Sequence, residues 1–156
     1  MHVEIPGYFY NDPKMSSVDL EKINILSELV CSEKWAQFVS TKSRHLMLMQ
    51  EDEWPAKIVA ENKYWYHWLD DWNDENFTHF STLLSTIDIS ELSTVYVFWM
   101  KEVGLKTNWK VFCNNWGNFL FEDEGCILVI PDSELALIFS NGHTWLERRY
   151  NLNEKQ

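Results

Sequence analysis

The sequence predicts an α+β domain in which a helical N-terminal half packs on a C-terminal antiparallel β-meander. Two observations lead to this class. Before residue 120, apolar residues recur mainly at helical spacing, and after it short apolar runs alternate with turn residues. The 156 residues contain no internal repeat and no linker rich in Pro, Gly or Ser. We therefore expect residues 1–156 to form a single globular domain.

Two helices are predicted in the first third of the chain, after an irregular lead-in over residues 1–15. Ser16 and Ser17 offer an N-cap for the short first helix. Ser27 is placed to cap the second, longer helix, which should end within residues 41–44. The apolar side chains of this second helix form one stripe: Cys31, Trp35, Phe38 and Val39.

Residues 51–75 have the most unusual composition of the chain. They combine eight acids and two lysines with six Trp and Tyr residues. We assign the first half of this acidic–aromatic segment to a loop, with a helical turn over residues 64–69. The apolar run just before it, residues 45–49, fits a strand or a buried loop, and periodicity does not decide between them.

A third helix, a strand and a fourth helix are expected next. Asp74 is a good N-cap for the third helix, whose apolar residues are Phe77, Phe80, Leu83 and Leu84. Residues 94–100 are β-branched and aromatic, which indicates a central strand covered on both faces. Thr107 or Asn108 caps the fourth helix, and Gly117 is expected to end it in a left-handed conformation. This last helix has an apolar face of Trp109, Phe112, Cys113 and Trp116.

The C-terminal part reads as a meander of short strands and tight turns. Asn141-Gly142 is the strongest two-residue hairpin signal in the chain. Polar residues 150–156 are expected to form a frayed tail. The strands are predicted at 118–121, 126–130, 135–139 and 144–149, with turns at 122–125 and 131–133.

A set of aromatic residues at fixed spacing carries a resemblance to a known family. The segment is Trp109-x-x-Phe112-x-x-x-Trp116-x-Asn118-Phe119-Leu120-Phe121-x-Asp123-Glu124-Gly125, preceded by Thr94-Val95-Tyr96. Over roughly residues 92–149 the chain resembles a family of small uncharacterised bacterial proteins, a domain of unknown function found mainly in gammaproteobacteria. This resemblance implies no reaction and no catalytic residues. The same aromatics also fit a plain packing role, as a helix face that covers the meander.

The charge balance narrows the class of partner. Thirteen basic and 24 acidic residues give a net charge of −11. Nucleic acids and anionic membranes are therefore not expected as partners, because both are bound through Lys and Arg. The N-terminus lacks the basic start and apolar run of a signal peptide, so we expect a cytoplasmic protein. In general character the chain is similar to bacterial toxin-immunity proteins, which are small, acidic, cytoplasmic α+β domains.

No catalytic residue, cofactor site or metal site is predicted. The five glycines lie too far apart for a phosphate-binding loop, and the three cysteines form no Cys-x-x-Cys pair and are expected to be buried thiols. The strongest metal candidate is the acidic turn over residues 70–75 with His67 or His79. It lacks the glycine of a calcium loop and the additional His or Cys that zinc requires, so a solvated acidic turn fits better.

The acidic–aromatic segment is predicted to be a recognition surface for a basic protein. Tryptophans are good anchors in interfaces, and carboxylates steer basic partners and pair with Arg and Lys. The preferred function is a non-catalytic immunity protein that neutralises a basic, nuclease-type toxin by direct binding. Three alternatives stay open: a charged loop with its tryptophans in the core, an interaction or regulatory domain without a toxin, and an enzyme with an unrecognised carboxylate site. The predicted partner-binding residues are Glu51, Asp52, Glu53, Asp70, Asp71, Trp72, Asp74 and Glu75.

Overall fold

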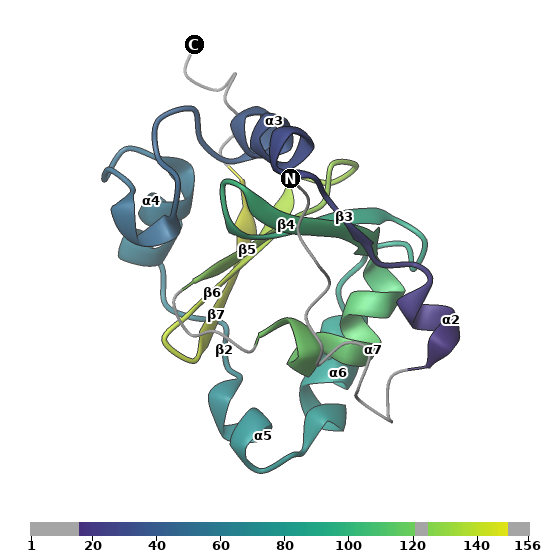
Figure 1. Ribbon diagram of the computed structural model, residues 1–156. Coiled ribbons are helices and arrows are strands. Elements are labelled where there is room, and N and C mark those ends of the chain that lie inside the picture. The colour runs from purple at the N-terminus through teal and green to yellow at the C-terminus, as the bar shows by residue number, and fades with distance from the viewer. Residues whose placement is uncertain (1–15, 121–124, 150–156) are drawn as a thin grey trace.

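The computed structural model describes residues 16–120 and 125–149, in which one antiparallel sheet lies between two groups of helices (Figure 1). The helices are α2 Ser17–Leu20, α3 Glu28–Phe38, α4 Trp54–Glu61, α5 Leu69–Asn73, α6 Phe77–Ser85 and α7 Trp109–Phe119, with a 3₁₀ turn at Leu46–Leu48. The strands are β1 Asn24–Ile25, β2 Tyr66–His67, β3 Thr94–Met100, β4 Val103–Asn108, β5 Cys126–Val129, β6 Leu135–Ser140 and β7 His143–Arg148. This element content confirms the predicted α+β class.

The sheet has the strand order β1-β4-β3-β5-β6-β7-β2. Strands β5, β6 and β7 form the predicted meander, and β3 pairs with both β4 and β5. Two short strands from the N-terminal half, β1 and β2, close the two edges of the sheet. Such short edge strands leave little unpaired backbone for pairing with another chain.

Side-chain alternation along the strands divides the core into two clusters. In β3, Val95 and Val97 pack with residues of α6 and α7, whereas Tyr96 and Phe98 pack with residues of α3 and α4. All four are at most 7% exposed. Because successive strand residues point to opposite faces, a strand apolar at every position needs cover on both sides. The prediction of a central strand covered on both faces is confirmed.

Local capping signals place several elements as predicted. The side chains of Ser16, Ser27 and Asn108 accept hydrogen bonds from the backbone N–H groups three residues later and cap α2, α3 and α7. Helix α3 ends at Phe38, a few residues earlier than expected. At the β6–β7 turn, Asn141 and Gly142 both have positive φ, 52° and 82°, as the predicted two-residue hairpin requires.

The acidic–aromatic segment is more regular than predicted. Residues 54–61 form α4 where a loop was expected, because Pro55 lies in the first turn, where proline favours helix, and Trp54 and Ile58 share the buried face. Residues 66–67 form β2 and not part of a helical turn. Residues 45–49 are neither strand nor buried loop, since Met47 in the 3₁₀ turn is 71% exposed.

Two further predictions are wrong in detail. Asp74 ends α5 and does not cap α6, which begins after Asn76 without a side-chain cap. Gly117 does not end α7: the helix continues to Phe119, which replaces the start of the strand expected at 118–121. A Cβ at position 117 would lie 2.5 Å from Cε1 of Phe77, so this glycine permits the close approach of α6 and α7.

Some predictions fall outside the described residues, namely the lead-in over 1–15, most of the turn at 122–125 and the tail over 150–156. Strand β4 was not predicted from the sequence.

Among the helices that the structure describes, none has the length and apolar character needed to cross a bilayer.

Candidate functional site

The structure divides the predicted recognition segment between two places. Trp54 and Ile58 of α4 belong to the core cluster that α3 covers, whereas Trp68, just before α5, belongs to the cluster that α6 and α7 cover. Figure 1 accordingly shows α4 and α5 well apart, with α5 beside α6. The acids at 51–53 and the acids at 70–75 therefore do not form one patch.

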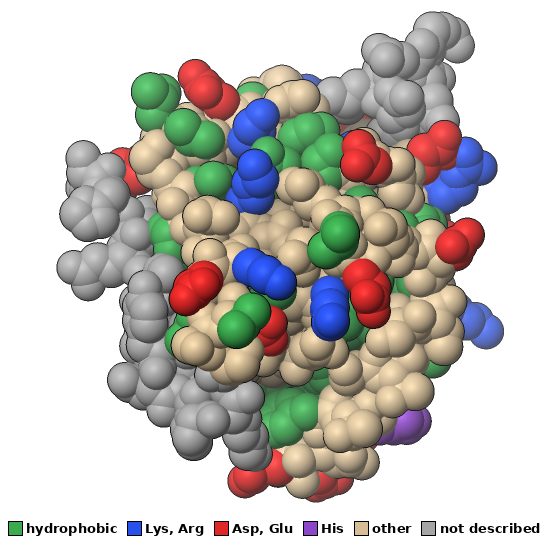
Figure 2. Space-filling view, turned by 90° about the vertical axis from the view of Figure 1, so that its right-hand side faces the viewer, with side chains coloured by type: hydrophobic (Ala, Val, Ile, Leu, Met, Phe, Trp, Pro, Cys, Tyr) green, Lys and Arg blue, Asp and Glu red, His purple; other side chains and the backbone are tan. Residues whose placement is uncertain are grey.

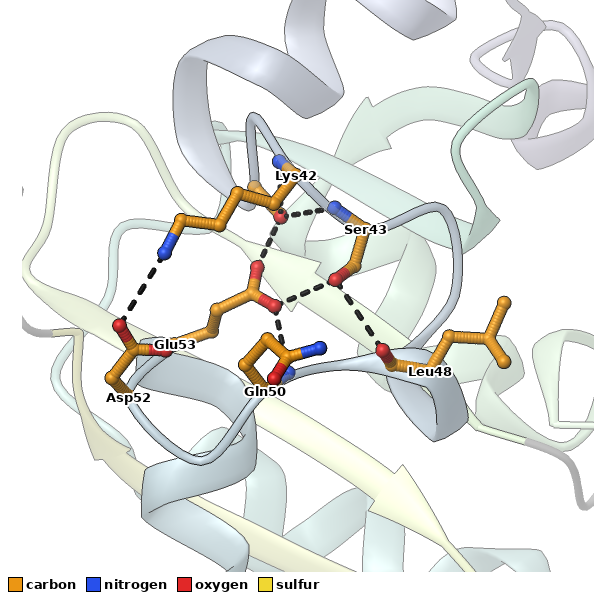
Figure 3. A network of polar contacts seen from close by, with 7 residues as sticks. Lys42, Ser43, Leu48, Gln50, Asp52 and Glu53 are labelled. Atoms are coloured by element: carbon orange, nitrogen blue, oxygen red, sulfur yellow. Dashed lines mark hydrogen bonds and ion pairs between the residues drawn. The ribbon is translucent and has the colours of Figure 1, made fainter.

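In the first group, Glu53 is buried and its carboxylate is occupied by the protein itself (Figure 3). It accepts hydrogen bonds from the hydroxyl groups of Ser40 and Ser43, the latter at 2.6 Å, and from the backbone N–H of Gln50 at 2.8 Å. Burial opposes ionisation of Glu53, but these hydrogen bonds and nearby Lys42 outweigh it and lower the pKa of the carboxyl. Glu53 thus ties the start of α4 to the chain after α3 and is removed from any partner surface.

The two neighbours of Glu53 face solvent. Glu51 is exposed, and Asp52, with 71% of its side chain exposed, forms an ion pair with Lys42 at 3.3 Å. Exposed pairs of this kind contribute little to stability. These two acids remain accessible, but a lysine already offsets one of them.

The second group lies on α5, beside β2 and α6, and is organised by Tyr66. The phenol of Tyr66 donates a hydrogen bond to Asp71 at 2.5 Å and lies 2.8 Å from Nδ1 of His79. Asp71 itself is only 14% exposed and lies 3.5 Å from the same His79 nitrogen. Burial, then the hydrogen bond and charge of Asp71, raises the pKa of Tyr66, so the phenol stays protonated. Tyr66 therefore fixes the orientation of Asp71 and is unsuited to act as a base or nucleophile.

The remaining acids of this group point into solvent. Asp70 is 75% exposed and contacts Nδ1 of His67 at 3.1 Å. Asp74 and Glu75 are exposed at the turn between α5 and α6, and form no ion pair within the part of the chain that the structure describes. Asp70, Asp71, Asp74 and Glu75 are called the α5 acidic surface below.

Trp72 faces the protein interior in part. Its indole N–H donates to the carbonyl oxygen of Gly117 at 3.0 Å, and its ring packs on the core. Trp54 and Trp68 are 4% and 2% exposed, and Trp65 is half-buried against the same core as Trp72. The tryptophans of the segment thus mainly attach α4 and α5 to the sheet, and the acids carry the accessible chemistry.

The α5 acidic surface lies in a part of the chain without compensating positive charge. Between Lys63 and Lys101 the sequence contains no Lys or Arg, while six acids fall there: Asp70, Asp71, Asp74, Glu75, Asp88 and Glu91. The face shown in Figure 2 differs, because Lys and Arg side chains lie among the Asp and Glu side chains at its centre. The segment that forms β2, α5 and α6 therefore contributes negative charge that no Lys or Arg of its own offsets.

The described residues include three thiols, and they also include His, Asp and Glu side chains, which are possible metal ligands. Burial raises the pKa of Cys31 and Cys113 to about 12 and that of Cys126 further still, so these thiols are protonated and shielded. Across residues 16–120 and 125–149, no three His, Cys, Asp or Glu side chains are grouped so that they could hold a metal ion.

The sequence did not predict several contacts around the α5 acidic surface. Pairing of β2 with β7 brings His143 opposite His67, and α6 brings His79 to Tyr66. The Asn141-Gly142 turn predicted the β6–β7 hairpin, but no local signal shows which distant strand pairs with the free edge of β7. The sequence suggested His67 and His79 only as possible metal ligands beside the acidic turn, and it did not predict their contacts with His143 and Tyr66.

The fold thus has α–β–α layers, and the α5 acidic surface is the group of carboxylates that it carries beside β2 and α6. The chain belongs to the family described as "Protein of unknown function (DUF2947)", whose sequence model matches residues 8–146. This confirms the predicted membership of an uncharacterised family and extends it over most of the N-terminal half. No curated protein and no solved structure matches the chain.

Proposed function

We propose that this protein is a non-catalytic binding protein that engages a basic protein through the α5 acidic surface. The observation that carries the proposal is the exposure of Asp70, Asp74 and Glu75 in a stretch of chain without any Lys or Arg. Exposed carboxylates near one another attract a positively charged partner over several ångströms and raise its association rate. The net charge of −11 acts in the same direction.

The local geometry supports binding by this surface. Asp71 is held by Tyr66, and α5 is attached to the core through Trp72, so the helix that carries Asp70 and Asp71 is fixed before any partner arrives. Binding to a preorganised group loses less conformational freedom. Glu53 takes no part, and Glu51 and Asp52 lie outside this surface.

The second part of the proposal identifies the class of the basic partner. We infer that it is a nuclease-type bacterial toxin domain, which this protein neutralises as an immunity protein. A nuclease binds phosphate through Lys and Arg, and a row of carboxylates is complementary to the same residues. Binding there blocks the toxin without any chemistry in the inhibitor.

The experiment measures binding to the product of the gene adjacent to the one that encodes this chain. Association is compared for the wild type, for the double variant D74K/E75K, and for a control with the same charge change at exposed acids elsewhere, E33K/D132K. Asp71 is left unchanged because its carboxylate supports Tyr66. We expect the association rate to fall at least about tenfold in D74K/E75K and far less in the control, with similar melting temperatures.

Two results contradict the proposal. An affinity that does not change between about 50 and 500 mM salt removes the electrostatic argument. Turnover of a substrate by the purified protein contradicts the proposal that the protein is non-catalytic. If the product of the adjacent gene binds this surface but is not toxic, only the assignment of the partner as a toxin is wrong. The protein is then an interaction or regulatory domain.

A further inference from the structure

Three side chains form a cluster of mutually tilted rings next to the α5 acidic surface. The β2–β7 pairing sets His67 opposite His143, with ring centroids 4.7 Å apart. Tyr64 contacts both histidines: its ring centroid lies 4.2 Å from that of His143, with planes inclined by 33°, and 6.4 Å from that of His67, with planes inclined by 51°. We call Tyr64, His67 and His143 the ring cluster.

A fixed scaffold supports the ring cluster. The ring of Trp145, two residues after His143, lies 6.0 Å from the His143 ring, and its indole N–H donates to the carbonyl oxygen of Asn62 at 3.0 Å. The backbone N–H of Trp65 donates to the carbonyl oxygen of Thr144 at 2.7 Å, which holds the segment around Tyr64 against β7. Strand pairing therefore sets the positions of His67 and His143, and the Trp65–Thr144 hydrogen bond holds the segment next to Tyr64 against β7.

One carboxylate adjoins the ring cluster. Oδ2 of Asp70 lies 3.1 Å from Nδ1 of His67, and 75% of the Asp70 side chain is exposed. The side chain of His67 is 34% exposed, and Tyr64 is 51% exposed. Two partly exposed rings in mutual contact and an exposed carboxylate that contacts one of them thus lie together here.

We propose that the ring cluster and Asp70 bind the guanidinium group of an arginine side chain that the basic partner presents. This inference rests on the proposed function and specifies which residue of the partner is recognised. The guanidinium is planar, so it stacks on the exposed ring of Tyr64 while its N–H groups donate to Asp70. A lysine ammonium pairs with Asp70 but gains no stacking, because it is a compact and strongly hydrated charge.

The charge around the ring cluster favours a cationic guest. Asp70, Asp71 and Asp74 lie on α5 or at its end, and no Lys or Arg follows in sequence before Lys101. Lys63 precedes Tyr64 and is exposed, and it is the positive charge nearest to the ring cluster in sequence. An arginine of the partner therefore meets a net negative environment with one side made of rings.

The test uses two short synthetic peptides that differ only in carrying two arginines or two lysines. Binding to the full-length protein is followed by NMR in about 50 mM salt, with the ring signals of Tyr64, His67 and His143 assigned. We expect the arginine peptide to bind at least about threefold more tightly and to shift these ring signals. Y64L should abolish the preference, Y64F should keep it because the ring remains, and the control D132N should leave both affinities unchanged.

The outcomes separate this inference from the proposed function. Equal binding of both peptides, with shifts at Asp74 and Glu75 only, overturns the arginine site and leaves the α5 acidic surface standing. A preference for arginine that survives in Y64L also overturns it. Failure of both peptides to bind anywhere overturns the inference and the proposed function together. Melting temperatures of all variants show whether a loss reflects unfolding.

Discussion

The backbone N–H of Leu69 donates a hydrogen bond to the carbonyl oxygen of Gly142, with an N···O distance of 3.3 Å. Leu69 is the first residue of α5, and Gly142 is the second residue of the β6–β7 turn. A Cβ added at Gly142 would lie 2.8 Å from Cβ of Leu69. The tip of the hairpin therefore lies directly against the start of the helix that carries Asp70 and Asp71.

This contact predicts that G142A is destabilising. Alanine at position 142 must adopt a φ near +82° and also displace Leu69. We expect the free energy of unfolding to fall by about 2 kcal/mol. Urea unfolding followed by tryptophan fluorescence measures the change. N141G, one residue earlier in the same turn, serves as the control and should change it by less than about 1 kcal/mol; equal effects of the two would contradict the argument.

The Glu53 network predicts a clear difference between two neighbouring acids. E53Q replaces the carboxylate that accepts hydrogen bonds from Ser40, Ser43 and Gln50. The amide N–H₂ of glutamine is a donor, so at least one of these three groups loses its acceptor. We expect a loss of about 2 kcal/mol in unfolding free energy. D52N breaks only an exposed pair with Lys42 and should cost under about 0.5 kcal/mol. If E53Q and D52N lowered the unfolding free energy by similar amounts, the buried hydrogen bonds of Glu53 would contribute no more to stability than an exposed ion pair.

The same carboxylate makes stability depend on pH in a defined direction. The pKa of Glu53 in the folded protein lies below its ordinary value of 4.5, so the folded state favours the ionised form. Its stabilising effect is fully present above pH 4.5 and is lost as the pH falls through the folded value. The difference in unfolding free energy between wild type and E53Q should therefore be constant near neutrality and shrink below that pH. A difference that grows on acidification would reverse the assigned sign.

The three thiols are predicted to be inert in the folded protein. Cys31, Cys113 and Cys126 are buried, and burial raises the pKa of each. Because the thiolate is the reactive form, a disulfide reagent at about pH 8 should label none of them at an appreciable rate. All three should react after unfolding in urea. Rapid labelling of one thiol before unfolding would place it outside the core.

Much of the fold could be predicted from local signals. Ser16, Ser27 and Asn108 cap their helices through bonds to residues three positions away, so these helix starts depend only on nearby sequence. Strand β3 was recognised because every residue fits a strand buried on both faces. Helix α4 was missed although Pro55 is a good start signal, because the acids around it suggested a solvated loop.

The candidate site was predicted less well, for a physical reason. Residues 51–75 are continuous in sequence, and their acids were expected to work together. The segment instead passes from one side of the sheet to its far edge, which separates Asp52 from Asp70. Adjacent acids also differ in environment: Glu53 is buried and hydrogen-bonded, while Asp52 faces solvent.

The sequence by itself determined the class of fold, the strong negative charge, the capped helices and the Asn141-Gly142 hairpin, because each depends on composition or on residues within a few positions. Only the tertiary structure decided that His143 lies opposite His67, that Tyr66 holds Asp71, and that Glu53 faces inward. The His67–His143 contact arises from strand pairing between segments far apart in the chain, and the other two depend on which side chains the packed fold buries, so no periodic pattern encodes them.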